Sequence, residues 1–158
     1  MALKGDRTIL EYRIDYFCDY THERGGVVFA ESFGSGVAMD QAVQKVYYPG
    51  NPSGLFPIGV LMNDGKNYDL TRQTRNVHKD EFQVGGKCTV APKCQIVTNM
   101  LVSGITITAG QRAFVGVDGR FTNVDGGAIA SPWVGQFDSN KDEDGYAKIT
   151  VNLPATRR

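Results

Sequence analysis

The chain has 158 residues, and its 17 basic side chains balance its 17 acidic ones, so the formal net charge is zero. This balance argues against nucleic acid as a partner, because neutralising phosphates requires a basic surplus. No run approaches the roughly 18 apolar residues of a membrane span, and the three cysteines (Cys18, Cys88 and Cys94) are too few for a disulfide framework. The first residues lack the apolar segment of a secretory signal, so we expect synthesis in a reducing cytoplasm.

Residues 1–24 differ from the rest of the chain because aromatic side chains alternate there with charges. The stretch "TILEYRIDYFCDYTHERGG" has too few apolar groups for an independent core. We predict an extended N-terminal arm that docks on its own domain, on a sister subunit or on another protein. The alternative is that this segment is simply the first strand of the same sheet.

Residues 25–158 are predicted to form a single all-β domain. Short runs such as "GVVFAES", "PIGVLM", "RAFVGV" and "AKITVNL" are rich in Val, Ile, Thr and Phe, and glycines bound almost all of them. This composition and spacing are typical of a small β-barrel or β-sandwich of short antiparallel strands with long loops. Segments 37–48 and 69–82 show no clear apolar stripe, so we expect loop or strand there, with at most a short helical turn.

Aspartate–glycine pairs predict several hairpin turns. Asp118-Gly119 lies between "AFVGV" and "RFTNV", an arrangement that puts Ala113, Val115 and Val117 on one face of a strand and Phe114 on the other. Asp64-Gly65 and Asp125-Gly126-Gly127 repeat the pattern.

The stretch "NKDEDGYAKITV" resembles a calcium loop in its first half. Asn140, Asp142, Asp144 and Gly145 occupy positions 1, 3, 5 and 6, but position 12 requires a bidentate carboxylate and holds Val151. The flanks alternate like strands instead of helices. We therefore favour a polar hairpin loop closed by Gly145, with a weak calcium site as the alternative.

No arrangement of residues predicts a metal, a cofactor or a catalytic centre. The candidate ligands His22, His78, Cys88 and Cys94 lack zinc spacing, and the two thiols flank Pro92, around which they could face each other across a turn. Both thiols are expected to be partly buried.

Nucleophile and acid–base motifs are equally incomplete. "AESFGSG" only superficially resembles a nucleophile elbow at Ser32, because it lacks the first glycine and a strand–turn–helix context. The paired carboxylates lie in polar stretches that are read as solvated loops, namely Asp142/Glu143/Asp144, Asp80/Glu81 and Asp15/Asp19. We expect the protein not to be an enzyme, and Trp133 to belong to the core.

Several blocks taken in order carry a resemblance to a known family. The run from "GVAMDQAVQKVYYP" through "PIGVLMNDGKNYDLTRQTRNVHKDEFQVGGKCTV", then "AFVGVDGRFTN" and "VGQFDSNKDEDGYAKITVNLP", resembles the capsid decoration (cement) proteins of tailed bacteriophages. The resemblance covers residues 25–154 and carries no catalytic motif. It implies a small β-barrel or β-sandwich, made in the host cytoplasm, that binds the outside of the phage head after expansion and stabilises it.

On this reading the partners are the major capsid protein and further copies of the chain itself, as a homotrimer in preference to a homodimer. The proposed contacts are aromatic side chains of the arm and of exposed loops, because aromatic residues are enriched at interface centres. They are Tyr12, Tyr16, Phe17, Tyr20, Tyr47, Tyr48 and Phe56. Packing within the chain is the alternative for each of them, and loop 138–144 could face either capsid or solvent.

A second class of function is a β-barrel binding module for carbohydrate or a host surface. It would need an exposed aromatic platform, and Trp133 with Tyr146 is the loose candidate.

Overall fold

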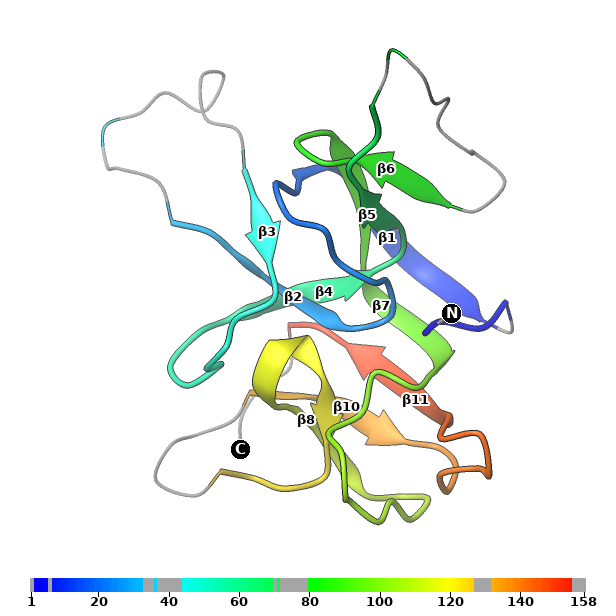
Figure 1. Ribbon diagram of the computed structural model, residues 1–158. Helices are drawn as coiled ribbons and strands as arrows, with labels where there is room; N and C mark the ends of the chain where they lie inside the picture. Colours follow the sequence, from blue (N-terminus) through cyan, green and yellow to red (C-terminus); the bar gives the residue numbers. More distant parts are fainter. Residues whose placement is uncertain are drawn as a thin grey trace.

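The computed structural model describes residues 2–5, 7–32, 36, 44–69, 71, 80–126 and 132–154. Within these residues the protein is all-β and has no α-helix; an antiparallel sheet curls into a half-barrel, as the sequence predicts (Figure 1). The described part of segments 37–48 and 69–82 forms loop and short strand, while residues 37–43 and 72–79 lie outside the described residues.

The main sheet is built from short strands. Its order is β3-β2-β4-β7-β11-β10-β8-β9, and β1 also pairs with β7. A small second sheet pairs β5 with β6 in parallel. The strand bounds are β1 (Thr8–Phe17), β2 (Val27–Ala30), β3 (Val46–Tyr47), β4 (Pro57–Leu61), β5 (Asp64–Lys66), β6 (Glu81–Gln83), β7 (Lys87–Thr98), β8 (Arg112–Val115), β9 (Phe121–Thr122), β10 (Trp133–Phe137) and β11 (Ala147–Asn152).

Strand β7 is the centre of the fold, and it changes partner along its length. Its first half pairs with β4 at Val90 and Ala91, and its second half pairs with β11 from Lys93 onward. Pro92 lies at this change of partner, so its missing N–H falls where β7 passes from one neighbour to the next. The carbonyl of Pro92 still accepts a hydrogen bond from the N–H of Leu153.

This arrangement corrects the expectation of a turn between Cys88 and Cys94. Both thiols lie on one continuous strand, so they do not face each other across Pro92. Both are also buried more deeply than expected, at 2% and 1% exposed, and Cys18 is fully buried.

The C-terminal half of the sheet curls until its far edge returns to the chain that follows β7. Residues 100–102 run beside β9, where the Val102 N–H donates to the carbonyl of Phe121 and the Phe121 N–H donates to that of Met100. The enclosed space holds the larger apolar core. Fully buried members include Phe121, Phe137, Ile96 and Ile149.

A smaller core lies between β2, β4 and the first half of β7. It comprises Cys18, Val28, Val46, Leu61, Phe82, Cys88 and Val90.

Two of the predicted hairpins are confirmed. At Asp118-Gly119 both residues have positive φ (54° and 69°), as a type I′ turn requires, and the Arg120 N–H donates to the Val117 carbonyl. Val117 itself is 54% exposed, so it does not share a buried face with Ala113 and Val115, and Phe114 is buried as well.

The loop between β10 and β11 is a hairpin closed as predicted. Gly145 has φ of 83°, and its N–H donates to the carbonyl of Asp142. The Asp142 carboxylate also accepts a hydrogen bond from the Tyr146 N–H.

The hairpin prediction at Asp64-Gly65 is wrong. These residues form β5, which runs parallel to β6, and the Gly65 N–H donates to the carbonyl of His22. A Cβ on Gly65 would lie 2.5 Å from the Tyr20 carbonyl oxygen, so the glycine serves a close backbone approach instead of a turn. The third predicted turn, at residues 125–127, lies partly outside the described residues.

The N-terminal segment is extended and docks on its own domain. Strand β1 pairs antiparallel with β7 from Thr8↔Gln95 to Phe17↔Lys87. Leu3 and Ala2 continue along the same edge and are buried in the core. Whether residues 1–24 also reach another subunit stays a prediction, as does their separation from residues 25–158.

Candidate contact surface

The outward side of β1 carries three exposed apolar side chains at strand spacing. Leu10 is 79% exposed, Tyr12 60% and Ile14 62%. Alternate residues of a strand point to the same face, so this spacing gathers them into one stripe. We call Leu10, Tyr12 and Ile14 the β1 stripe.

Charged side chains occupy the opposite face of β1. Arg13 Nη2 lies 3.5 Å from Glu11 Oε1, and Lys93 Nζ of the neighbouring strand lies 3.5 Å from Glu11 Oε2. Glu11 and Arg13 therefore share a face, and Tyr12 between them points to the other one. Both ion pairs are long compared with the roughly 2.7–2.9 Å of a charge-assisted hydrogen bond, so they hold these side chains only loosely.

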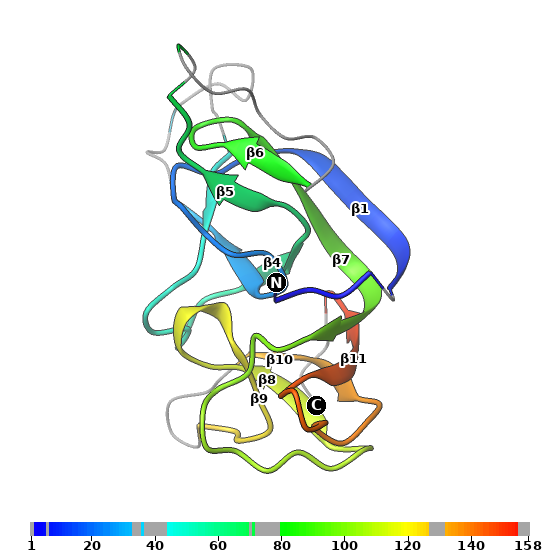
Figure 2. The ribbon, with the colours of Figure 1, turned by 45° about the vertical axis from the view of Figure 1, so that its right-hand side comes forward.

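Strand β1 is also an edge strand. Among the described residues β7 is its only strand partner, and only its last residue is engaged on the other side, where the Phe17 N–H donates to the Gln44 carbonyl. Figure 2 shows β1 as the outermost strand on its side of the molecule. The pairing of β1 with β7 is irregular between Ile9 and Glu11, between Glu11 and Arg13 and between Arg13 and Tyr16, so the stretch that carries the stripe is held less regularly than a continuous ladder.

Two of the predicted contact residues at the end of β1 are half-buried. Tyr16 packs against the smaller core, and its carbonyl accepts a hydrogen bond from the Cys88 thiol. The Phe17 ring lies under Lys87 Nζ at 5.8 Å. Both side chains are thus largely engaged within the chain.

The rings of Tyr20 and Tyr48 both pack against the ring of His22. Ring centroids are 5.3 Å apart for Tyr20 and His22 and 4.4 Å apart for His22 and Tyr48. Tyr20 remains 42% exposed. The Tyr48 hydroxyl donates to the carbonyl of Glu23 and accepts from the N–H of Gly26, and burial raises its pKa. Burial also lowers the pKa of His22.

The remaining two predicted residues lie near the β3–β4 loop. Tyr47 packs against the larger core. Phe56 is 85% exposed, the most exposed of the large apolar side chains in the described residues. Phe56, Tyr12 and Tyr20 are therefore the predicted residues that are free to contact a partner, and the structure does not bring the seven into one patch.

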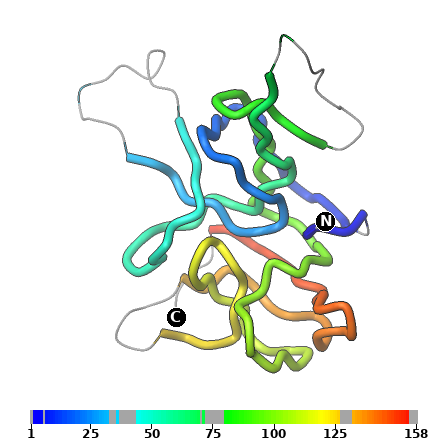
Figure 3. Tube along the Cα trace, in the orientation of Figure 1, coloured from blue at the N-terminus to red at the C-terminus, as the bar shows by residue number. Residues whose placement is uncertain are grey.

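The loop that carries Phe56 and the strand that carries the β1 stripe lie on opposite sides of the molecule (Figures 1 and 3). The intervening elements are β4 and β7, which hydrogen-bond to each other. One subunit therefore presents two separate apolar surfaces.

The sequence suggested several groups for chemistry, and the structure describes most of them. Among the described residues, no three His, Cys, Asp or Glu side chains are grouped so that they could hold a metal ion. Burial raises the pKa of Cys88 and of Cys94 to about 12, which keeps both thiols protonated and unreactive. His78 lies outside the described residues, and Ser32 is exposed.

The pair Asp80/Glu81 corrects the expectation of a solvated loop. Glu81 is buried and accepts a hydrogen bond from the Tyr68 hydroxyl. Asp80 binds Arg24 Nη1 at 2.6 Å and Arg7 Nη2 at 3.1 Å. Partial burial raises the pKa of Asp80, but the hydrogen bonds from Arg7 and Arg24 outweigh it and leave the pKa below the ordinary value.

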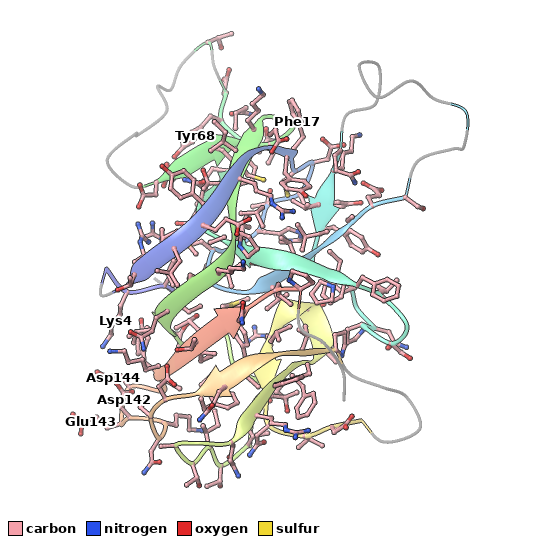
Figure 4. The ribbon with its side chains drawn as sticks, turned by 180° about the vertical axis from the view of Figure 1, so that it is seen from behind. Lys4, Phe17, Tyr68, Asp142, Glu143 and Asp144 are labelled. Carbon is pink, nitrogen blue, oxygen red and sulfur yellow. The ribbon has the colours of Figure 1, made fainter. Side chains whose placement is uncertain are left out.

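The acidic hairpin tip lies next to the N-terminal segment. Figure 4 shows Asp142, Glu143 and Asp144 at the end of the β10–β11 hairpin with Lys4 nearby. Lys4 Nζ lies 4.2 Å from the centroid of the Tyr146 ring. The three carboxylates are exposed. The orientation of loop 138–144 toward capsid or solvent stays a prediction.

Trp133 and Tyr146 do not form a platform. The register Gly135↔Val151 and Phe137↔Ile149 places them at opposite ends of the β10–β11 hairpin, about 20 Å apart along the strands. Trp133 is half-buried, contrary to the expected core position; its indole N–H donates to the Gly135 carbonyl, and Arg112 lies over its ring at 5.2 Å.

Sequence reasoning missed Leu10 and Ile14. Their signal is present, since apolar residues alternate with charges in "LEYRI". Attention to aromatic residues alone selected Tyr12 and passed over its two aliphatic neighbours.

In comparisons with known proteins, no family model matches this chain and no curated protein matches it. The described residues contain no helix with the length and hydropathy that crossing a bilayer would require.

Proposed function

We propose that this protein is a structural virion protein that binds the outer surface of a tailed-phage head. It stabilises the expanded capsid by bridging neighbouring subunits of the major capsid protein. It is made in the host cytoplasm and ends on the capsid exterior. The resemblance of residues 25–154 to capsid decoration proteins motivates the proposal.

The observation that carries the proposal is the presence of two exposed apolar surfaces on opposite sides of one β scaffold. A bridging protein needs at least two such surfaces. The β1 stripe supplies one, and Phe56 on the β3–β4 loop supplies the other. Covering these side chains would add favourable burial energy, and a contiguous patch such as the β1 stripe is typical of interaction sites.

The mechanism is thermodynamic linkage between binding of this protein and assembly of the capsid. A protein that binds the expanded lattice but not its dissociated subunits stabilises the lattice by mass action. Covering one exposed aromatic side chain contributes on the order of 1.5–3 kcal/mol. Repetition of modest contacts over many positions makes the sum large for the whole shell.

Co-sedimentation with phage heads tests the proposal. The purified protein is mixed with undecorated expanded heads and, separately, with unexpanded proheads of the same phage. We expect saturable binding to expanded heads, and greater resistance of those heads to heat. Absence of binding to both forms would overturn the proposal and direct attention to glycan binding.

A matched pair of variants tests the Phe56 surface. Phe56→Ser should weaken binding to heads about tenfold or more, because the burial of one aromatic side chain is lost. Val124 is also exposed, at 57%, and lies outside both surfaces, so Val124→Ser should bind like the unmodified protein. Equal binding by the two variants would exclude Phe56 from the interface.

A further inference from the structure

The free edge of β1 has a sequence that is complementary to itself. Two copies of β1 can be aligned antiparallel so that Tyr12 of one lies opposite Tyr12 of the other. In this register Leu10 lies opposite Ile14 of the second copy, and Glu11 lies opposite Arg13. Tyr12 lies opposite Tyr12 on the two-fold axis. Every apolar residue of the stripe therefore faces an apolar residue, and both charged residues face the opposite charge.

This register agrees with the faces that the structure assigns. The stripe residues lie on one face of β1, and Glu11 and Arg13 lie on the other. In an antiparallel pair, directly opposed residues project to the same face, so apolar pairs and ion pairs would separate onto the two faces of the joined sheet. The side chains of Glu11 and Arg13 are 41% and 45% exposed. Their ion pairs are 3.5 Å long and the Arg13 Nη1 hydrogen bond to the Tyr16 hydroxyl is 3.4 Å long, so these weak contacts can be exchanged for contacts with a partner.

Charge distribution excludes the neighbouring registers. A shift by two residues in either direction would set Glu11 opposite Glu11 or Arg13 opposite Arg13, and like charges directly opposed destabilise a strand pair. A shift by one residue would set stripe residues opposite charged ones. Among the registers within two residues of it, the register centred on Tyr12 is the one that satisfies the apolar and the charged residues of 10–14 together.

We propose that β1 is a self-association edge, through which two copies join by antiparallel β1–β1 pairing over residues 10–14. The pairing closes with two copies, so of the oligomers considered from the sequence it selects the dimer. It supplies the backbone partners that an edge strand lacks and covers the β1 stripe. In the pair each β1 stripe is covered by the other copy, and the two β3–β4 loops, one from each copy, become the surfaces that bridge capsid subunits in the proposed function.

Sedimentation equilibrium of the full chain tests the pairing without phage heads. We expect a monomer–dimer equilibrium with a dimer of twice the 17.3 kDa chain mass. Glu11→Arg alone and Arg13→Glu alone each set like charges opposite one another at two symmetric positions, and each should raise the dissociation constant about tenfold. The double variant restores opposite charges and should restore the dimer. A monomer throughout, or a dimer that single reversals do not weaken, would overturn the proposal.

Cysteine cross-linking tests the register and stays informative if a charge reversal impairs folding. Tyr12→Cys places two thiols opposite each other at the two-fold axis, so oxidation should give a covalent dimer. Ile14→Cys is the matched control: the two thiols would be about 13 Å apart along the strands, beyond the roughly 7 Å limit for a disulfide. The native cysteines are all buried and do not compete. Equal cross-linking by the two variants, or none by Tyr12→Cys, would overturn the register.

Because these measurements use the isolated protein, their outcome is independent of head binding. A dimer that fails to bind heads would contradict the proposed function alone, and a monomer that binds heads would contradict the self-association alone.

Discussion

Gly135 is the position at which a single added methyl group should cost most. A Cβ on this residue would lie 1.9 Å from the Thr150 carbonyl oxygen, about 1.4 Å short of the roughly 3.3 Å at which carbon and oxygen make contact. It would also lie 2.9 Å from the Thr150 carbonyl carbon and 3.1 Å from Val151 Cα. All three are backbone atoms of β11, which pairs with β10 at this point, so no rotamer change relieves the clash.

Gly135→Ala should therefore reach the upper end of overpacking costs, about 3 kcal/mol. For a chain of this size that corresponds to a fall in melting temperature of roughly 6–12 °C. Urea denaturation followed by circular dichroism measures the difference in unfolding free energy. The slope against urea shows whether the variant still unfolds as one unit.

Two glycines provide matched controls. Gly50 has no atom within 4 Å of an added Cβ and no positive φ, so Gly50→Ala should change stability by less than about 0.5 kcal/mol. Gly104 is equally open but has φ of +77°, so Gly104→Ala isolates the cost of the left-handed conformation, about 1 kcal/mol. If Gly135→Ala unfolds at the same urea concentration as Gly50→Ala, the close approach of β10 and β11 is refuted.

Three further predictions concern titratable groups. Cys88 and Cys94, whose pKa values burial raises to about 12, should resist a thiol reagent in the folded protein and react once urea unfolds it. Burial lowers the pKa of His22, so as the pH falls the unfolded chain takes up a proton before the folded protein does. The stability that His22 contributes above its ordinary pKa of 6.5 should therefore be lost as the pH drops below 6.5. His22→Gln should flatten this pH dependence in melting curves. Asp80→Asn weakens hydrogen bonds to two arginines, one of them the nearly buried Arg24, and should lower the unfolding free energy in urea titrations by about 1–3 kcal/mol. An unchanged midpoint would contradict that contribution.

The contrast between two identical dipeptides shows how far local sequence signals reach. Asp118-Gly119 forms the predicted turn, because β8 and β9 need only a short connection and both residues adopt positive φ. Asp64-Gly65 lies in a strand, because the partner of β5 is β6, which follows 15 residues later. Turn propensity is local, whereas the competing strand pairing is not, so the sequence predicts one case and misses the other.

The same limit applies to Pro92 and to the contact surface. A proline within an apolar run signals a break, yet β7 continues through Pro92 because its neighbours change there.

In the N-terminal segment the alternation of residues 10–14 is readable, but whether that face is covered depends on β7, some 80 residues away. Composition is therefore enough to predict the all-β class, whereas exposure has to be read from the folded chain.

The position of β7 has a consequence for the order in which the chain can fold during synthesis. Strands β1 and β4 both precede their central partner, and Thr8 waits for Gln95 before it can pair. Until the ribosome has released β7, β1 has no strand partner, and the β3-β2-β4 group, which can pair by itself, keeps an open edge at β4. Such a nascent chain gains little from early folding and is open to association with other chains. Completion of β7 would thus act as the timing step that converts a vulnerable polypeptide into a protected one.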